Sequence, residues 1–308
     1  MTNPQLTIGS RGSDLALYQA NFIREILTTQ HGCEVDIKII KTAGDKIDNV
    51  SFDKMEGKGF FTKELEDALL AREIDLAVHS LKDLMTTQPE GLKLGAAGYR
   101  ANRNELLLIN PDAHTGNGVL PIKTGSTIGT SAARRKAQIA FHHAGLQIED
   151  LRGNVPTRVA KLRNGDYDAI LIAAAGVERL NLDLNGIVAV QLDPEVFLPA
   201  PAQGILGIQI RRNDPRVESV ITKLGSPEEM ASAQLERGLL AKFDSGCSLP
   251  LGVHSETRGQ EYRLTAVLGV RHADIWAGLK KINVIGKDIP ALIEEAFTQL
   301  QKADECRA

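Results

Sequence analysis

The chain has 308 residues, of which 43% are hydrophobic and 24% charged, with 36 Lys and Arg against 39 Asp and Glu. This composition is ordinary for a globular protein of two or three domains, and the net charge of −3 argues against a general nucleic-acid binder. The N-terminus has no basic region followed by an apolar core, and no apolar run could cross a membrane, so we expect a soluble cytoplasmic protein without nucleic-acid or membrane partners.

Residues 6–8 are expected to form a first strand, followed by a tight turn and an amphipathic helix with Ser13 as its N-cap. Arg11 then lies just outside a helix N-terminus, which favours anions. Residues 35–40 form a second expected strand. The polar segment 41–59 has no hydrophobic periodicity, and such a long irregular segment suggests a lid, which would carry Lys58. A phosphate-binding loop is rejected because its motif spacing is absent.

An amphipathic helix through residues 61–69 leads into a short apolar strand at residues 76–78. Lys82 and Asp83 follow this strand, at the place where an open α/β sheet binds its ligand. Asp83 is the only carboxylate in this turn. The alternative is a solvated Lys–Asp ion pair with no function.

After another strand at 92–97 and a crossing at 99–104, the same pattern begins again. A strand is expected at 106–109, and a further strand ends at 128–131, where Ser131 is expected to cap the next helix. Arg134 and Arg135 then fall in the first helical turn, which disfavours cations, so they indicate a binding site. Two solvated arginines are the alternative.

Residues 151–156 repeat this arrangement, with Arg152 at a strand end and Arg158 in the first turn of the next helix. Residues 169–173 form a buried strand, and Arg179 is expected near its junction with a helix. Arginine binds carboxylate and phosphate through two parallel hydrogen bonds. Because the protein is slightly acidic overall, a group of cations at the ligand-binding ends of its strands implies a polyanionic ligand. The cations concerned are Arg11, Lys82, Arg134, Arg135, Arg152, Arg158 and Arg179.

The rest of the chain completes a two-lobed α/β protein with a third, smaller domain. A strand at 188–192 and a Pro-rich crossing at 198–204 precede a buried strand at 205–210 that can return to the first lobe. Helices are expected at 231–243 and 289–303, and strands at 262–270 and 275–284. We therefore predict domains at 1–99 with 200–214, at 100–199 and at 215–308, with a cleft between the two lobes.

The three cysteines indicate neither a disulfide framework nor a zinc site, because they are widely spaced and lack a C-x-x-C motif. No histidine spacing indicates a metal either. Cys247 lies in a loop between Gly246 and Pro250, where it could be a nucleophile or a covalent attachment point; a spare cysteine is the alternative. Cys33 and Cys306 suggest no such role.

Five segments together resemble the porphobilinogen deaminase (hydroxymethylbilane synthase) family, and the resemblance runs nearly end to end. They are V-H-S-L-K-D at 78–83, G-T-S-A-A-R-R at 129–135, L-R-G-N-V-P-T-R at 151–158, P-A-P-A-Q-G at 199–204 and G-C-S-L-P-L-G at 246–252.

The resemblance implies two lobes like those of periplasmic binding proteins and a third domain with the reactive cysteine. It implies a monomeric transferase that condenses four porphobilinogen molecules into hydroxymethylbilane, releasing ammonia, in tetrapyrrole and heme biosynthesis. A dipyrromethane cofactor would be attached through Cys247. By position, Asp83 would be catalytic and would bind cofactor together with Lys82, Ser131, Arg134, Arg135 and Arg158. Arg11, Ser13, Arg152 and Arg179 would bind substrate or the growing chain.

The sequence departs from the family pattern at several places, and two other functions stay open. Ala132 replaces a hydroxyl residue, Met85 replaces a proline, Glu56 replaces a lid glycine, and residues 100–105 differ from the usual hinge. A solute-binding module would share the two lobes but would need no loop cysteine. A phosphate-ester or nucleotide enzyme could use the arginines, but the usual nucleotide-binding motifs are absent.

Overall fold

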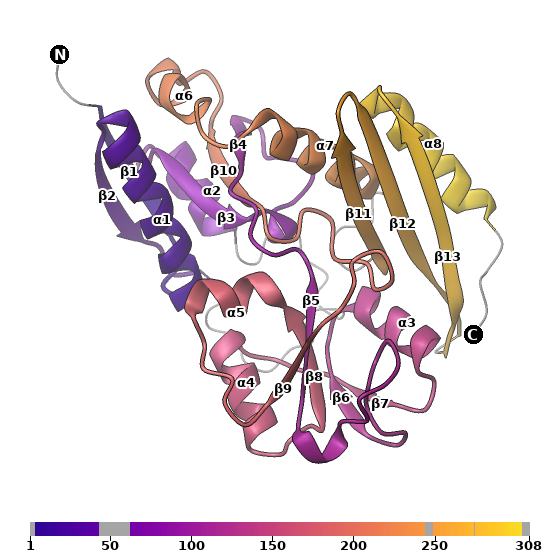
Figure 1. Cartoon of the computed structure of the whole chain (residues 1–308). Helices are drawn as coiled ribbons and strands as arrows, with labels where there is room; N and C mark the ends of the chain where they lie inside the picture. The colour runs from indigo at the N-terminus through magenta and orange to yellow at the C-terminus, as the bar shows by residue number, and fades with distance from the viewer. Residues whose placement is uncertain (1–3, 43–61, 244–248, 274, 304–308) are drawn as a thin grey trace. The chain divides into compact units, whose positions relative to one another are not determined.

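The computed structural model describes residues 4–42, 62–243, 249–273 and 275–303. The chain divides into two compact units (Figure 1). The described part of the first unit comprises residues 4–42, 62–101 and 204–233. The second unit comprises residues 102–203 and the described residues from 234 onwards. The finer division into three domains stays a prediction.

The first unit is built on a sheet whose strands are β1 (Gln5–Ser10), β2 (Glu34–Ile39), β3 (Leu76–Ser80), β4 (Leu92–Gly98) and β10 (Leu206–Arg211). Among the described residues this sheet has five strands in the order β2-β1-β3-β10-β4. β1 is parallel to β2 and β3, whereas β10 is antiparallel to β3 and β4. The chain therefore returns from the second unit to place β10 inside the first sheet, as predicted.

Helices cover this sheet because its strands are apolar on both faces. The helices of the unit are α1 (Asp14–His31), α2 (Lys63–Leu70), the short 3-10 helix η3 (Leu81–Asp83) and α6 (Pro215–Ile221). Leu76 and Val78 of β3 pack in one core with α1 and α6, while Ala77 between them packs in a second core with α2. This alternation confirms the buried strand predicted before Asp83.

The second unit contains a sheet of the same kind. Its strands are β5 (Glu105–Ile109), β6 (Thr127–Gly129), β7 (Gln147–Glu149), β8 (Ala169–Ala173) and β9 (Val188–Gln191). Its helices are η4 (Pro111–Ala113), α3 (Ala133–His142), α4 (Val155–Arg163) and α5 (Ala174–Leu180). Among the described residues the strand order is β7-β6-β8-β5-β9, with β6 parallel to β7 and β8, and β5 antiparallel to β8 and β9.

The two sheets have the same topology. In each, three parallel strands lie side by side, in the orders β2-β1-β3 and β7-β6-β8, and one antiparallel strand separates the third of them from the edge strand. That antiparallel strand is β10 in the first unit and β5 in the second, and each directly follows a crossing between the units. The prediction of two like α/β lobes is confirmed.

The C-terminal part of the second unit is a three-stranded antiparallel sheet with helices. It comprises β11 (Leu251–Arg258), β12 (Glu261–His272), β13 (Ile275–Gly286), α8 (Ile289–Lys302) and the part of α7 (Pro227–Lys242) from residue 234 onwards. Leucines of α7 and α8 share a core with these strands. α3 also contacts β12 and β13, and a Cβ atom on Gly269 would lie 2.5 Å from Cβ of Ala137.

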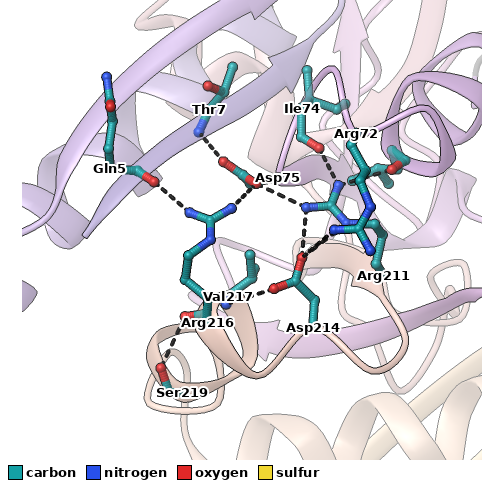
Figure 2. A network of polar contacts seen from close by, with 11 residues as sticks. Gln5, Thr7, Arg72, Ile74, Asp75, Arg211, Asp214, Arg216, Val217 and Ser219 are labelled. Carbon is teal, nitrogen blue, oxygen red and sulfur yellow. Dashed lines mark hydrogen bonds and ion pairs between the residues drawn. The ribbon is translucent and has the colours of Figure 1, made fainter.

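A buried ion-pair network fixes the amino-terminal edge of the first sheet (Figure 2). The Arg211 guanidinium at the end of β10 donates to Asp214 at 2.8 Å and to Asp75, just before β3, at 2.9 Å. Asp75 also accepts the Thr7 N–H of β1 at 3.0 Å and binds Arg216 of α6. Three strands and one helix are thus joined at the edge opposite to Asp83.

Two elements were not predicted from the sequence. β11 was missed because His254 and Ser255 interrupt its apolar pattern, yet both side chains are buried. The Ser255 hydroxyl donates to Glu236 at 2.6 Å, and Arg103 contacts His254 at 3.4 Å, so buried polar partners replace apolar ones. α6 was missed although Asp214 caps it and Pro215 follows, which is a standard helix start.

Candidate active site

The predicted residues of the first unit lie at one edge of its sheet. β1 and β3 are adjacent and parallel, so both end at the same edge, where Arg11 and Ser13 follow β1, and Lys82 and Asp83 follow β3. The Ser13 side chain accepts the Ala16 N–H at 3.4 Å, which confirms the predicted N-cap of α1. Gln19 of α1 donates to Ser80 at 2.8 Å and joins this helix to the end of β3.

Asp83 lies on a turn whose backbone is anchored before and after it. The Leu81 N–H donates to the Ile205 carbonyl at 2.9 Å, and the Leu84 N–H donates to the Leu81 carbonyl at 3.3 Å. Leu81 and Leu84 are buried, whereas Asp83 is exposed and Lys82 half-buried. The turn therefore presents a carboxylate to solvent on a backbone that packing holds in place.

The predicted residues of the second unit follow its three adjacent parallel strands. Arg158, in the first turn of α4, donates through Nε to the Gly153 carbonyl at 2.7 Å, and Asn154 caps this helix. Arg152 is half-buried in the turn that precedes α4. Arg179 lies in the last turn of α5, so it stands farther from the junction of β8 with its helix than the sequence indicated. α5 begins immediately after β8, earlier than the sequence pattern indicated.

Ser131 does not cap α3, contrary to the prediction. Its hydroxyl donates to the Leu151 carbonyl at 3.0 Å and accepts the Leu151 N–H at 3.1 Å. Ala132 is the N-cap residue, and it has no side chain that could accept a hydrogen bond. The neighbouring segment thus takes the hydroxyl, and Ser131 joins the end of β6 to the segment that follows β7.

Arg134 and Arg135 are buried against a carboxylate of the chain itself. Arg134 Nη2 lies 2.6 Å from Glu105 Oε1, and Arg135 Nε lies 2.8 Å from Glu105 Oε2. Arg134 also donates to the Leu198 carbonyl at 2.7 Å, and Arg135 to the Leu171 carbonyl at 2.9 Å. Glu105 has no exposed surface, and each arginine exposes 6%. The alternative of two solvated arginines is therefore wrong.

This arginine cluster, formed by Arg134, Arg135 and Glu105, carries two positive charges and one negative charge. Burial lowers the pKa of Arg134; Glu105 counteracts this, and the charge of Arg135 adds to it. Arginine stays protonated in proteins, so one positive charge is uncompensated within the cluster. Gln203, from the second crossing, donates to Glu105 at 3.1 Å. Sequence reasoning missed Glu105, whose signal was an acidic residue opening an otherwise apolar strand.

Two predicted residues, Lys58 and Cys247, lie outside the described residues. Cys33 is described, and its side chain is buried with 2% exposure. Burial raises the pKa of its thiol, with Lys223 opposing this effect. The thiolate is the reactive form of cysteine, so Cys33 is unsuited to covalent chemistry.

One group of side chains in the described ranges has the composition of a metal site. Ligand atoms of Glu195, His254 and Glu256 lie within 4.8 Å of one another. However, Arg263 binds Glu195 at 3.1 Å, and Arg258 binds Glu256 at 2.9 Å. These carboxylates therefore belong to ion pairs of the C-terminal sheet.

No helix in the described part of the chain is long and apolar enough to cross a membrane.

Comparisons with known proteins identify relatives over most of the chain. The family model described as "Porphobilinogen deaminase, dipyromethane cofactor binding domain" matches residues 6–219, and "Porphobilinogen deaminase, C-terminal domain" matches residues 230–289. A porphobilinogen deaminase of Lysinibacillus sphaericus is 39% identical over 299 residues, covering 97% of this chain and 94% of the relative. One of Syntrophobacter fumaroxidans is 40% identical over 256 residues, covering 83% and 81%. Among solved structures, the periplasmic VFT2 domain of Bordetella pertussis BvgS has a TM-score of 0.45 at 14% identity, covering 75% of this chain and 92% of that domain.

Proposed function

This chain belongs to the porphobilinogen deaminase family, and we propose that it condenses four porphobilinogen molecules, with loss of ammonia, into hydroxymethylbilane through the carboxylate of Asp83. The observation that carries the proposal is the family match over two segments, one of which includes Asp83 and the other Cys247. The enzyme is thus a transferase of tetrapyrrole biosynthesis. We further propose that it acts as a cytoplasmic monomer without a nucleic-acid partner.

The arginine cluster fits a dipyrromethane cofactor, whose two pyrrole rings each carry an acetate and a propionate. Two buried guanidinium groups share one internal carboxylate, so a ligand carboxylate would complete the neutralisation. Arg134 makes two hydrogen bonds with described residues, out of the five N–H groups that a guanidinium offers. Arg134 and Arg135, with Ser131, Arg158, Lys82 and Asp83, are therefore proposed to hold the cofactor, which supplies the primer to which pyrrole units are added.

Cys247 is proposed as the attachment point of this cofactor. In the sequence it lies between Gly246 and Pro250, within the segment that matches the family's C-terminal domain, which supports this proposal. Cys33 is excluded by its burial in the core of the first unit. A thioether to Cys247 would fix the primer covalently, so the cofactor would stay with the protein between turnovers.

Asp83 is proposed to assist the loss of ammonia from porphobilinogen. The departing amine needs a proton, and the remaining pyrrole acquires positive charge that its ring nitrogen shares. A carboxylate fixed beside that nitrogen stabilises the developing charge without reorganising, as water would have to. The same group can accept the ring N–H and relay a proton to the leaving nitrogen. Asp83 suits this role because the buried Leu81 and Leu84 hold its turn.

Three further arginines and Ser13 are proposed to hold the substrate or the growing chain. Arg11 and Ser13 of the first unit, and Arg152 and Arg179 of the second, are the residues concerned. Arg152 lies in a turn before a helix N-terminus, a setting that favours carboxylates. Arg179, in the last turn of α5, has no such helix-terminus support and would act through its guanidinium alone.

The test combines intact-protein mass with single-turnover ammonia release. The parent protein should exceed its sequence mass by one dipyrromethane unit, and Cys247→Ser should remove the excess while Cys33→Ser keeps it. At matched cofactor occupancy, Asp83→Asn should slow ammonia release by at least ~10²-fold, because it deletes the charge and keeps the shape. Asp83→Glu should retain more activity than Asp83→Asn. An adduct that persists in Cys247→Ser, or an Asp83→Asn variant as fast as the parent, would refute the respective assignment.

A further inference from the structure

A network of polar side chains, of which only Gln88 is half-buried rather than buried, connects β10 and α2 to the segments before and after the Asp83 turn. Gln209 of β10 is at its centre and has no exposed surface. Its Nε2 donates to Gln88 Oε1 at 2.7 Å and to Glu66 Oε1 of α2 at 3.3 Å, and its Oε1 lies 3.1 Å from His79 Nε2. His79 and Glu66 expose 7% and 8% of their surfaces.

The directions of these hydrogen bonds are interdependent. Because the Gln209 amide nitrogen faces two oxygen acceptors, its oxygen must face His79, so His79 Nε2 carries a proton and donates. A glutamine at this position can accept one hydrogen bond and donate two. An apolar residue of the same length could do neither, and a glutamate would place a carboxylate against Glu66.

The network holds both sides of the Asp83 turn. His79 lies in β3 before η3, while Gln88 donates through Nε2 to the carbonyl of Met85, after η3, at 2.6 Å. Gln209 therefore binds the segment before the turn directly and the segment after it through Gln88.

The backbone at Gln209 is adjusted locally. Ile208 pairs with Ala96 of β4, but Gln209 pairs with Leu94, so Gly95 is an extra residue in the ladder. Such bulges redirect side chains and are common beside active sites. Gln209 pairs with Ala77, which packs in an apolar core with Leu65 and Leu69. A matched set of apolar side chains could fill the same space at little cost in stability, so a connected polar set is better explained by the need for one defined geometry.

We propose that Gln209 is a positioning residue for the reaction: through His79 and Gln88 it sets the place of the Asp83 carboxylate. This inference rests on the proposed function, in which Asp83 assists ammonia loss. Gln209 does not itself reach substrate, because it is fully buried. Its effect should appear in the chemical step, since the cations assigned to substrate binding are not part of the network.

The experiment compares Gln209→Met and Gln88→Met with Leu27→Ala as the matched control. Methionine keeps the length of glutamine but removes its amide. Leu27 is buried in the α1 core of the same unit and is not part of the network, so its truncation destabilises the unit without touching the turn. Thermal unfolding, cofactor occupancy by intact mass, the KM for porphobilinogen and single-turnover ammonia release are measured for each, at a temperature where all are folded.

Gln209→Met should slow single-turnover ammonia release by about 10- to 100-fold, as expected for a catalytic group displaced by about 1 Å, while the KM changes little. Gln88→Met should slow ammonia release less than Gln209→Met does, because it breaks the link through Gln88 and leaves the link to His79. The double variant should be no slower than Gln209→Met, because both act through the same turn. Leu27→Ala should keep the parental rate although it unfolds at a lower temperature.

The inference is wrong if Gln209→Met releases ammonia as fast as the parent, or if the two methionine substitutions multiply in their effects. Should Gln209→Met fail to fold, the half-buried Gln88→Met decides, and a parental rate in that variant overturns the inference. Asp83→Asn, measured in parallel, distinguishes a failure of the catalytic role proposed for Asp83 from a failure of the positioning role proposed for Gln209. A parental rate in Asp83→Asn removes the catalytic assignment and the inference with it, whereas a slow Asp83→Asn beside a fast Gln209→Met removes only the inference.

Discussion

Glu105 should be the most sensitive position of the arginine cluster, and Glu105→Gln should lower the free energy of unfolding by about 3–5 kcal/mol. Glu105 is fully buried, and each of its carboxylate oxygens lies within 2.8 Å of a guanidinium nitrogen. Removing one partner of a buried ion pair leaves an uncompensated charge, which costs about this much. The cluster changes from one surplus positive charge to two.

Arg134→Leu should lower the free energy of unfolding by less than Glu105→Gln does, by about 1–3 kcal/mol. Glu105 would keep Arg135 at 2.8 Å and Gln203 at 3.1 Å. The Leu198 carbonyl would lose Arg134 but keep the Gln138 amide at 3.0 Å, so no buried group is left without a partner. The protein should therefore fold, and its lower cofactor occupancy would report on ligand binding.

Combining the two substitutions tests whether charge imbalance is the cause. Glu105→Gln with Arg134→Leu has the same cluster charge as the parent, so it should be more stable than Glu105→Gln alone by about 0.5–3 kcal/mol. Urea unfolding can be followed by the fluorescence of Trp276, the single tryptophan, which lies in the same unit. For the unfolding measurements every variant also carries Cys247→Ser, because a bound cofactor would itself add stability; the cofactor occupancy of Arg134→Leu is measured with Cys247 in place. A double variant that is destabilised by the sum of the two single losses would refute the charge argument.

Two further predictions concern stability. Burial opposes ionisation of Asp214, but the hydrogen bonds from Arg211 and the Val217 N–H, with the charges of Arg211 and Arg216, outweigh it and lower the pKa of Asp214. Because the pKa of Asp214 is lower in the folded state than in the unfolded state, ionisation of Asp214 stabilises the fold at pH values above its unfolded pKa of about 3.9. This stabilisation is lost as the pH falls through the folded pKa. Asp214→Asn should therefore lower the free energy of unfolding at pH 7 by about 3 kcal/mol. The difference from the parent, measured by urea unfolding, should shrink below about pH 4. A difference that does not change with pH would contradict this prediction. Ala132→Ser should raise the free energy of unfolding by about 1 kcal/mol in the same assay, because Ala132 has the extended backbone of an N-cap residue and no capping side chain. An unchanged or lower stability would show that a serine hydroxyl at this position does not cap α3.

The fold followed from the sequence wherever apolar periodicity and capping residues decided the structure. β3, α1 and β10 were predicted because their apolar residues follow the period of a buried strand or an amphipathic helix. β11 was missed because its burial depends on polar partners from distant segments, Arg103 and Glu236. Such partners are set by tertiary structure and leave no periodic signal in the strand itself.

The candidate site was predicted in part for the same reason. The position of Arg134 and Arg135 in the first turn of a helix marked them as unusual, and the structure explains this by Glu105, 29 residues away from Arg134. Ser131 was expected to cap a helix because local hydrogen bonds are the usual use of serine there, but the distant Leu151 backbone takes its hydroxyl. Local rules identified the important positions, while the partner of each depended on the topology of the sheet.

The two arginine clusters differ in charge balance, and this difference supports the binding role proposed for the cluster of the second unit. At the amino-terminal edge of the first sheet, Arg211 and Arg216 face Asp75 and Asp214, with the largely exposed Arg72 at 3.9 Å from Asp214 (Figure 2). Those two guanidinium groups and two carboxylates neutralise each other, so the network needs no ligand. At the carboxyl-terminal edge of the second sheet, two guanidinium groups face one carboxylate. A buried surplus charge is costly unless an anion arrives to balance it, so the unbalanced cluster is the one suited to hold a carboxylate of the cofactor.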